Sequence, residues 1–175
     1  LGCRAEYMFA PERPRTGEER VILHTEAGDL VIAFFRDAAP KTSAQLLKLF
    51  RLGLYEGQAF FRMEPDYVAQ LSDHHDRSES KPLTPEMEDA IARIPYEDSG
   101  VKHVGGALSL AHPNDDPDGG TTSFSVMLGP APHLDGRYTV FGCVITGKDV
   151  MEKLLQVPCA SNHNPVKRLE RFGIV

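Results

Sequence analysis

One stretch of the chain places an arginine where it could act as a fixed hydrogen-bond donor. Residues 60–70 are mostly apolar, apart from Arg62, Gln70 and a central Glu64-Pro65-Asp66 that favours a turn between two short strands. Arginine is seldom buried without a partner, and its guanidinium is a planar fork of N–H donors. On these residues alone, Arg62 is either a surface side chain of an edge strand or a donor held over an apolar pocket.

Four further motifs follow this stretch along the chain. The stretch itself contains Phe60-Phe61-Arg62, Tyr67 and Gln70-Leu71-Ser72-Asp73, and the later motifs are residues 106–111, Ser123-Phe124, His133-Leu134-Asp135-Gly136 and Phe141-Gly142. Together they resemble the pattern of the cyclophilin family of peptidyl-prolyl cis-trans isomerases, and the resemblance covers roughly residues 20–175. One such match is weak evidence, whereas all of them in the right order strongly favour the fold.

The resemblance implies an enzyme that accelerates rotation about the peptide bond before proline and so assists protein folding. Amide resonance gives this rotation a barrier of about 18–20 kcal/mol. No bond is broken, so the reaction requires no nucleophile, metal or cofactor. It requires a donor that binds the twisted amide better than either planar form. Arg62 occupies the arginine position of the family and is therefore the predicted catalytic residue.

The resemblance also implies an apolar pocket for the proline ring and a binding strand for the peptide. By position, the predicted substrate-binding residues are Tyr67, Val68, Gln70, Ala111, His112, Phe124, His133, Leu134 and Tyr138. Gln70 would hold Arg62 or the peptide carbonyl in place, while Ala111 and His112 would offer backbone groups. The residues alone leave another interpretation open, in which Tyr67, Val68, Phe124 and Leu134 are ordinary core residues.

Several positions depart from the family pattern, and they affect the expected rate and substrate preference more than the expected fold. The departing residues are Phe61, Leu71-Ser72, His112, Ser123, Ser125, His133 and Tyr138. Ser125 removes a large apolar side chain, which predicts a wider and more polar pocket. His133 stands where a rim tryptophan contacts cyclosporin in the family, so weak cyclosporin binding is predicted. The alternative function is a proline-peptide binding module or chaperone with weak or lost isomerase activity.

Short strands dominate the expected secondary structure. Beyond the two strands of the 60–70 stretch, strands are predicted at residues 21–25, 30–35, 107–111, 124–128, 138–145 and 168–175. Helices are predicted from Pro40 to Gly53 and from Asp149 to Leu155, with a shorter helical segment at 86–94. The pattern and the resemblance predict a mainly β fold, a closed eight-stranded antiparallel barrel capped by two α-helices. Residues 1–19 are expected to form an N-terminal arm or linker, and residues 20–175 a single domain.

Three other groups of residues suggest chemistry less strongly. Residues 114–119 resemble the start of a calcium loop, but the twelfth position is Ser125 rather than glutamate. His74-His75 would need further ligands to hold a metal, and Ser109 with His112 lacks the GxSxG elbow of a hydrolase. The prediction is therefore no metal and no cofactor.

Composition limits the partners. Charged residues make up 25% of the chain and the net charge is −6, which disfavours general nucleic-acid binding. No apolar run of about 18 residues is present, so no membrane span is predicted. The expected partners are proline-containing peptides and unfolded or folding proteins, bound by a monomer.

The compartment stays open. Leu1-Gly2-Cys3 resembles the end of a bacterial lipoprotein signal, which would imply a periplasmic protein anchored through Cys3; otherwise a cytoplasmic protein is expected. The other cysteines, Cys143 and Cys159, are expected to be free thiols, although a disulfide between them stays open.

Overall fold

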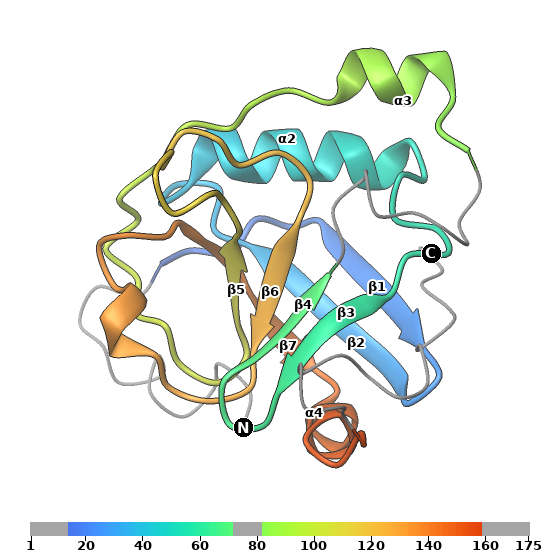
Figure 1. Ribbon diagram of the computed structural model, residues 1–175, viewed down its shortest axis with the longest axis vertical. Helices are drawn as coiled ribbons and strands as arrows, with labels where there is room; N and C mark the ends of the chain where they lie inside the picture. The colour runs from blue at the N-terminus through green and yellow to red at the C-terminus, as the bar shows by residue number, and fades with distance from the viewer. Residues whose placement is uncertain (1–13, 72–81, 159–175) are drawn as a thin grey trace.

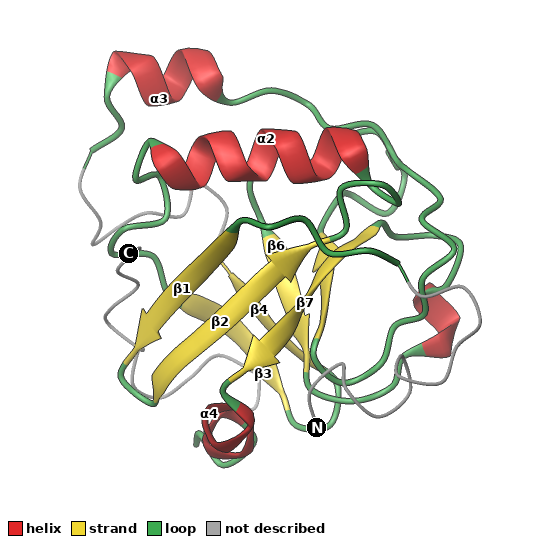
Figure 2. Cartoon of the chain, turned by 180° about the vertical axis from the view of Figure 1, so that it is seen from behind, coloured by secondary structure: helices red, strands yellow, loops and turns green. Residues whose placement is uncertain are grey.

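The sheet of the protein is antiparallel throughout and strongly curled (Figures 1 and 2). The computed structural model describes residues 14–71 and 82–158. Seven strands of these ranges form one sheet in the order β1-β2-β7-β5-β6-β4-β3. Their bounds are Arg20–Thr25 (β1), Gly28–Phe34 (β2), Phe60–Glu64 (β3), Val68–Leu71 (β4), Ala107–Leu110 (β5), Phe124–Met127 (β6) and Val140–Thr146 (β7). The predicted mainly β fold is confirmed.

The number of strands and the closure of the barrel are not confirmed. Within the described ranges, β1 and β3 are the two edges of the seven-stranded sheet. The eighth strand was expected at residues 168–175, which lie outside the described residues.

Helices cover both ends of the curled sheet (Figures 1 and 2). Helix α2 (Pro40–Arg51) and helix α3 (Pro85–Ala90) lie at one end, and α4 (Lys148–Leu154) lies at the other. The short segment predicted at 86–94 is thus a third helix, which the prediction of two capping helices did not count. Thr84 caps α3 as its sequence suggests, because its side chain accepts a hydrogen bond from the Met87 amide at 3.2 Å.

The N-terminus of α2 is capped by a residue far along the chain. Its own N-cap, Ala39, offers no side-chain acceptor. Glu97 accepts hydrogen bonds from the amides of Lys41 at 3.0 Å and Thr42 at 2.8 Å, and from the Thr42 hydroxyl at 2.7 Å. A carboxylate at this position satisfies free N–H groups and complements the helix dipole. Glu97 thereby ties the segment before β5 to the helix.

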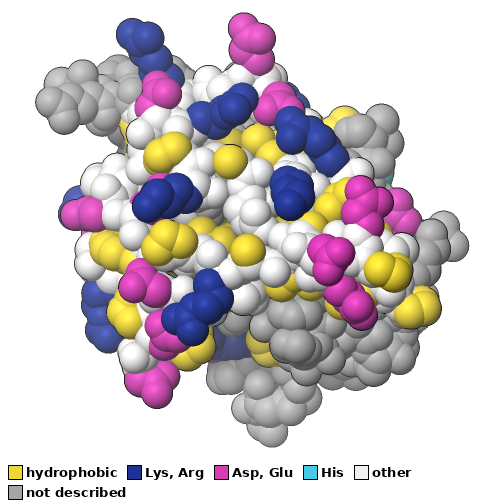
Figure 3. Space-filling model, turned by 90° about the horizontal axis from the view of Figure 1, so that it is seen from above, with side chains coloured by type: hydrophobic (Ala, Val, Ile, Leu, Met, Phe, Trp, Pro, Cys, Tyr) yellow, Lys and Arg dark blue, Asp and Glu magenta, His cyan; other side chains and the backbone are white. Residues whose placement is uncertain are grey.

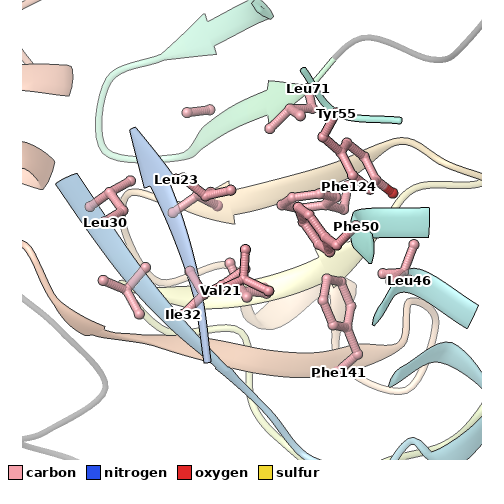
Figure 4. Packing of buried hydrophobic residues seen from close by; sticks show 14 of the residues in the cluster. Val21, Leu23, Leu30, Ile32, Leu46, Phe50, Tyr55, Leu71, Phe124 and Phe141 are labelled. Carbon is pink, nitrogen blue, oxygen red and sulfur yellow. The ribbon is translucent and has the colours of Figure 1, made fainter. Parts of the chain in front are cut away.

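Aromatic rings fill the core between α2 and the sheet (Figure 4). Phe50 of α2 packs against Tyr55, with ring centroids 4.1 Å apart and the rings tilted by 33°, and both rings contact Phe124 of β6. Phe141 of β7 packs against Phe124 from the side, with centroids 5.6 Å apart. The Tyr55 hydroxyl is buried and donates to the Thr122 carbonyl at 2.9 Å, so this tyrosine leaves no unpaired hydroxyl in the core.

The surface over α2 and α3 carries charged side chains of both signs, interspersed with apolar ones (Figure 3). In the described ranges, no helix is long and apolar enough to cross a membrane. The end of the expected arm contacts the domain: the Gly17 amide donates to the Phe34 carbonyl at 2.9 Å, and Glu19 pairs with Arg36 and Arg51.

Candidate active site

The strands β3, β4, β6 and β5 separate two sets of side chains onto opposite faces. One transverse row, Met63, Ala69, Val126 and Leu108, is buried in the core. The adjacent row is Arg62, Gln70, Ser125 and Ser109, which face the other way. Because side chains alternate along a strand, neighbouring rows must point to opposite faces. We call the second face, with Arg62, Glu64, Val68, Gln70, Ser109 and Ser125, the site face.

A β-bulge places Arg62 on the site face. Phe60 pairs with Leu71 and Arg62 pairs with Gln70, so Phe61 is an extra residue in β3. In a regular strand, Phe60 and Arg62 are two positions apart and would share one face. The bulge breaks this alternation, so Phe60 is buried while Arg62 is 40% exposed. Bulges commonly redirect a side chain beside a functional site.

The guanidinium of Arg62 is held on two sides. Its Nε donates to Glu64 Oε1 at 2.7 Å, and its second terminal nitrogen, Nη2, also donates to that oxygen. The Arg62 Cζ lies 5.7 Å from the centre of the Tyr67 ring, a cation–π distance. Arg62 is thus part-exposed but oriented, with further N–H groups beyond those that Glu64 accepts.

An apolar cluster lies beside Arg62 on the site face. Val68, Met127 and Ala131 are buried in it, and Tyr67 and Leu134 are partly exposed at its edge. Leu134 belongs to the single turn η2 (Pro132–Leu134), and so does His133. The Tyr67 hydroxyl lies 3.2 Å from His133 Nε2, with ring centroids 5.5 Å apart. The structure therefore brings together Arg62 with four predicted residues: Tyr67, Val68, His133 and Leu134.

Phe124 does not lie on this face, which corrects its prediction as a substrate-binding residue. Its ring is 0% exposed and packs in the core against Phe50, Tyr55 and Phe141 (Figure 4). The next residue, Ser125, takes the place on the site face because the alternation of β6 turns adjacent side chains to opposite sides.

Gln70 is the pairing partner of Arg62 across β3 and β4, but its side-chain amide bonds to Ser123. Its Nε2 donates to the Ser123 hydroxyl at 3.3 Å, and that hydroxyl donates to the Leu71 carbonyl at 2.7 Å. Gln70, which matches the family pattern, is thus joined in one network with Ser123 and Leu71, which depart from it. The network holds the Gln70 side chain toward Ser123.

His112 and Tyr138 form a separate aromatic pair. Their rings stack at 4.1 Å between centroids, and the Tyr138 hydroxyl donates to Asn114 Oδ1 at 3.0 Å. The two ring nitrogens of His112 lie 2.8 Å from the Pro113 carbonyl and 3.0 Å from the Arg137 carbonyl. The Ala111 amide donates to the Ser123 carbonyl at 3.0 Å, so that N–H is already used within the protein.

A buried hydrogen-bonded cluster anchors the turn η2 to the rest of the domain. His103 lies between Ser109, whose hydroxyl is 3.0 Å from Nε2, and Asp135, whose Oδ1 is 3.0 Å from Nδ1. Asp135 also accepts the His103 amide at 2.9 Å and pairs with Lys102 at 3.3 Å. The Ala131 amide donates to the His103 carbonyl at 2.9 Å. The turn with His133 and Leu134 is therefore tied to His103 on both of its sides.

This cluster has the residue types of a serine hydrolase, but its serine and histidine are not accessible to a substrate. The His103 side chain is 0% exposed and Ser109 is buried, so a substrate bond has no direct access to the hydroxyl. The hydrolase interpretation considered from the sequence paired Ser109 with His112; in the structure the partner of Ser109 is His103.

Burial and the local charges set the protonation of these groups. Burial lowers the pKa of His103 despite the opposing effect of Asp135, so the ring is neutral near neutral pH, with Nδ1–H donating to the carboxylate and Nε2 accepting from Ser109. Burial tends to raise the pKa of Asp135, but hydrogen bonds from His103 and Lys102 outweigh it and lower that pKa. Burial raises the pKa of Tyr67, with Arg62 opposing and Glu64 and Tyr138 adding to the effect.

The acidic loop after β5 has a structural partner. Arg93 donates two hydrogen bonds to the Asp116 carboxylate, at 2.6 and 2.8 Å, and Asp118 accepts the Tyr96 amide at 2.9 Å. Among the residues that the structure describes, no group of three or more histidine, cysteine or acidic side chains is arranged to hold a metal ion. His74-His75, Cys3 and Cys159 lie outside the described residues, while Cys143 is buried in β7.

Sequence reasoning missed Glu64, His103 and Asp135. Glu64 was expected in the turn after the strand that contains Arg62; in the structure it is the last residue of β3, two positions from Arg62, and therefore shares its face. The pairing of His103 with Asp135 had no signal in the sequence, since 31 intervening positions separate them and only the fold joins them.

Comparisons with known proteins agree with this architecture. The profile of the family described as "Cyclophilin type peptidyl-prolyl cis-trans isomerase/CLD" matches residues 20–172. The chain is 40% identical over 179 aligned residues to "Peptidyl-prolyl cis-trans isomerase CYP23" of Arabidopsis thaliana, covering all of this chain and 78% of that protein. It is 32% identical to a "Probable peptidyl-prolyl cis-trans isomerase" of Brucella abortus, covering 83% of this chain and 76% of the relative.

A solved structure has the same fold. A cyclophilin-type isomerase of Cryptosporidium parvum, crystallised in the presence of the dipeptide Ala-Pro, superimposes with a TM-score of 0.77 at 23% identity, covering 90% of this chain and 98% of that one. The sequence matches and the shared fold lead to one conclusion: this chain belongs to the cyclophilin-type family of peptidyl-prolyl cis-trans isomerases.

Proposed function

We propose that Arg62 is the catalytic group of this isomerase and that it acts on the twisted amide. When the Xaa-Pro bond rotates out of plane, resonance is lost and the proline nitrogen regains a lone pair. A guanidinium N–H directed at that nitrogen binds the twisted form more tightly than either planar form, which lowers the barrier. The observation that supports this role is an oriented, part-exposed arginine beside an apolar cluster.

The apolar cluster would receive the proline ring. Tyr67 and Leu134 offer partly exposed apolar surface next to Arg62, and the buried Val68 and Met127 pack against them. Ser125 lies on the same face, where the family has a large apolar residue, so the binding surface is expected to be more polar than usual. Gln70 would orient the peptide carbonyl, and Ala111, His112, His133 and Tyr138 would contact residues flanking the proline.

The substrates would be proline-containing peptides and unfolded or folding proteins, as the Ala-Pro dipeptide used with the Cryptosporidium relative suggests. We expect a monomer to be the active unit. No cofactor has a role in a bond rotation. We expect weak binding of cyclosporin, because His133 is smaller than an indole. We further expect that an eighth strand closes the barrel and that the catalytic domain begins near residue 20.

A protease-coupled assay on short Xaa-Pro peptides tests this proposal. The protein should accelerate the slow phase of cleavage, and Arg62→Ala should remove most of that acceleration. A protein that binds the peptides but leaves the slow phase unchanged would instead be a proline-peptide binding module.

A further inference from the structure

Glu64 is placed to control the orientation of Arg62. The two residues are two positions apart in β3 and share the site face. One carboxylate oxygen, Oε1, accepts both the Nε–H of Arg62, at 2.7 Å, and an N–H of its Nη2. The Glu64 side chain is only 23% exposed, so part of this contact is shielded from solvent.

The contact leaves donors available on the guanidinium. Arginine has five N–H groups, and Glu64 accepts from the edge formed by Nε and Nη2. Both hydrogens of Nη1 and one of Nη2 lie outside this contact. The guanidinium plane is fixed in addition by the Tyr67 ring, and the Tyr67 hydroxyl lies against His133. A chain of contacts therefore runs from Glu64 through Arg62 to the rim of the apolar cluster.

Orientation matters because Arg62 is a long side chain with 40% of its surface exposed. A free arginine side chain samples many rotamers, and each conformation that points away from the substrate contributes nothing to the transition state. A carboxylate that holds the Nε edge removes most of those conformations before the peptide arrives.

We propose that Glu64 is a positioning residue for catalysis: it holds the guanidinium of Arg62 by its Nε edge and so directs the remaining N–H groups at the proline nitrogen. This inference rests on the proposed role of Arg62. A residue that acts only through the orientation of Arg62 should affect the transition state more than the bound substrate, so the loss of Glu64 should lower kcat and leave KM nearly unchanged.

The test is a set of variants measured by kcat, KM and thermal melting. Glu64→Ala should lower kcat about tenfold, within the range caused by misplaced catalytic groups. Glu64→Gln should lie between Glu64→Ala and the unaltered protein, because the amide keeps an acceptor oxygen but loses the charge. Asp29→Ala is the matched control: Asp29 accepts from His24 at 2.7 Å in the hairpin of β1 and β2, strands that pair with neither β3 nor β4 in the described sheet, and kcat should not change.

A double-mutant cycle separates positioning from general structural support. In the Arg62→Ala background, Glu64→Ala should cause no further loss of kcat. NMR gives a second readout that does not depend on residual activity: the Nε–H resonance of Arg62 should be sharp and slow to exchange in the unaltered protein, and should broaden or exchange rapidly in Glu64→Ala.

Two results would overturn the inference. One is a kcat of Glu64→Ala equal to or above that of the unaltered protein, together with an unchanged Nε–H resonance. The other is an equal loss of kcat in the presence and absence of Arg62. If instead Arg62→Ala itself kept full activity, the proposed function of Arg62 would fail, and these outcomes are therefore distinguishable.

Discussion

Replacing Arg62 by alanine tests the central chemical step. The change removes the guanidinium while leaving the backbone of β3 and its bulge in place. Loss of one preorganised donor from an acyl-transfer oxyanion hole costs about 2.7–4 kcal/mol, and we expect a comparable 2–4 kcal/mol here. That range corresponds to a fall in kcat/KM of roughly 30- to 1,000-fold, since about 1.36 kcal/mol is tenfold in rate.

The same change should have little effect on folding. Arg62 is 40% exposed, and its pairing with Glu64 resembles surface ion pairs, which contribute about 0–1 kcal/mol. For a protein of this size, a loss of 1 kcal/mol lowers Tm by about 2–4 °C. The difference between a large effect on rate and a small effect on Tm is the signature of a catalytic residue.

The assay needs a matched arginine elsewhere. Arg51 is also exposed and also pairs with a glutamate, Glu19, but it ends α2 and lies away from the site face. Arg51→Ala should show unaltered isomerisation of Xaa-Pro peptides and a similar small change in Tm. If Arg62→Ala and Arg51→Ala had the same kcat/KM, the proposed mechanism would be wrong.

Three further measurements address the cap, the buried cluster and the rim. Glu97→Ala should lower the free energy of unfolding by about 1–2 kcal/mol in urea titration, because it removes the cap of α2; an unchanged midpoint would contradict that role. Burial lowers the pKa of His103, so as the pH falls below about 6.5 the unfolded chain binds a proton at this histidine that the folded chain does not. The Tm should therefore fall between about pH 7 and pH 5, and it should fall less in His103→Gln. His133→Trp should tighten cyclosporin binding about tenfold, because the indole adds a few tens of Å² of apolar contact at about 25 cal/mol per Å². Tight binding by the unaltered protein would show that other residues form the rim.

The regular elements were predictable because their signals are local. The strands expected at 21–25, 30–35 and 138–145 appear as β1, β2 and β7 with ends shifted by one or two residues. Pro40 marked the start of α2 correctly, and α3 begins at Pro85, one residue before the predicted segment. The turn at Pro65-Asp66 joins β3 and β4 as expected, and Asp66 adopts a positive φ of 59°, which aspartate tolerates better than most residues.

The features that the sequence could not reveal depend on distant segments. Glu97 caps α2 from 55 positions away, and Asp135 binds His103 from 32 positions away. The bulge at Phe61 was also hidden, because the run Phe60-Phe61-Arg62-Met63 does not show which residue is the extra one. The error on Phe124 has the same origin: its place in a family motif said nothing about which face of β6 it occupies.

The described departures from the family pattern leave the aromatic core intact, and this explains how the fold tolerates them. Ser125 lies on the site face, and His133 and Tyr138 lie in or near the η2 turn, so none of them contributes to the aromatic core. Ser123 and Leu71 are buried: the Ser123 hydroxyl donates to the Leu71 carbonyl, and the Leu71 side chain packs in the core. Sequence change that is confined to the site face alters the charge and size of the binding surface without removing core contacts. Glu64 belongs to the same face, so the group that orients Arg62 and the groups that select the peptide can vary together while the sheet that positions them stays the same.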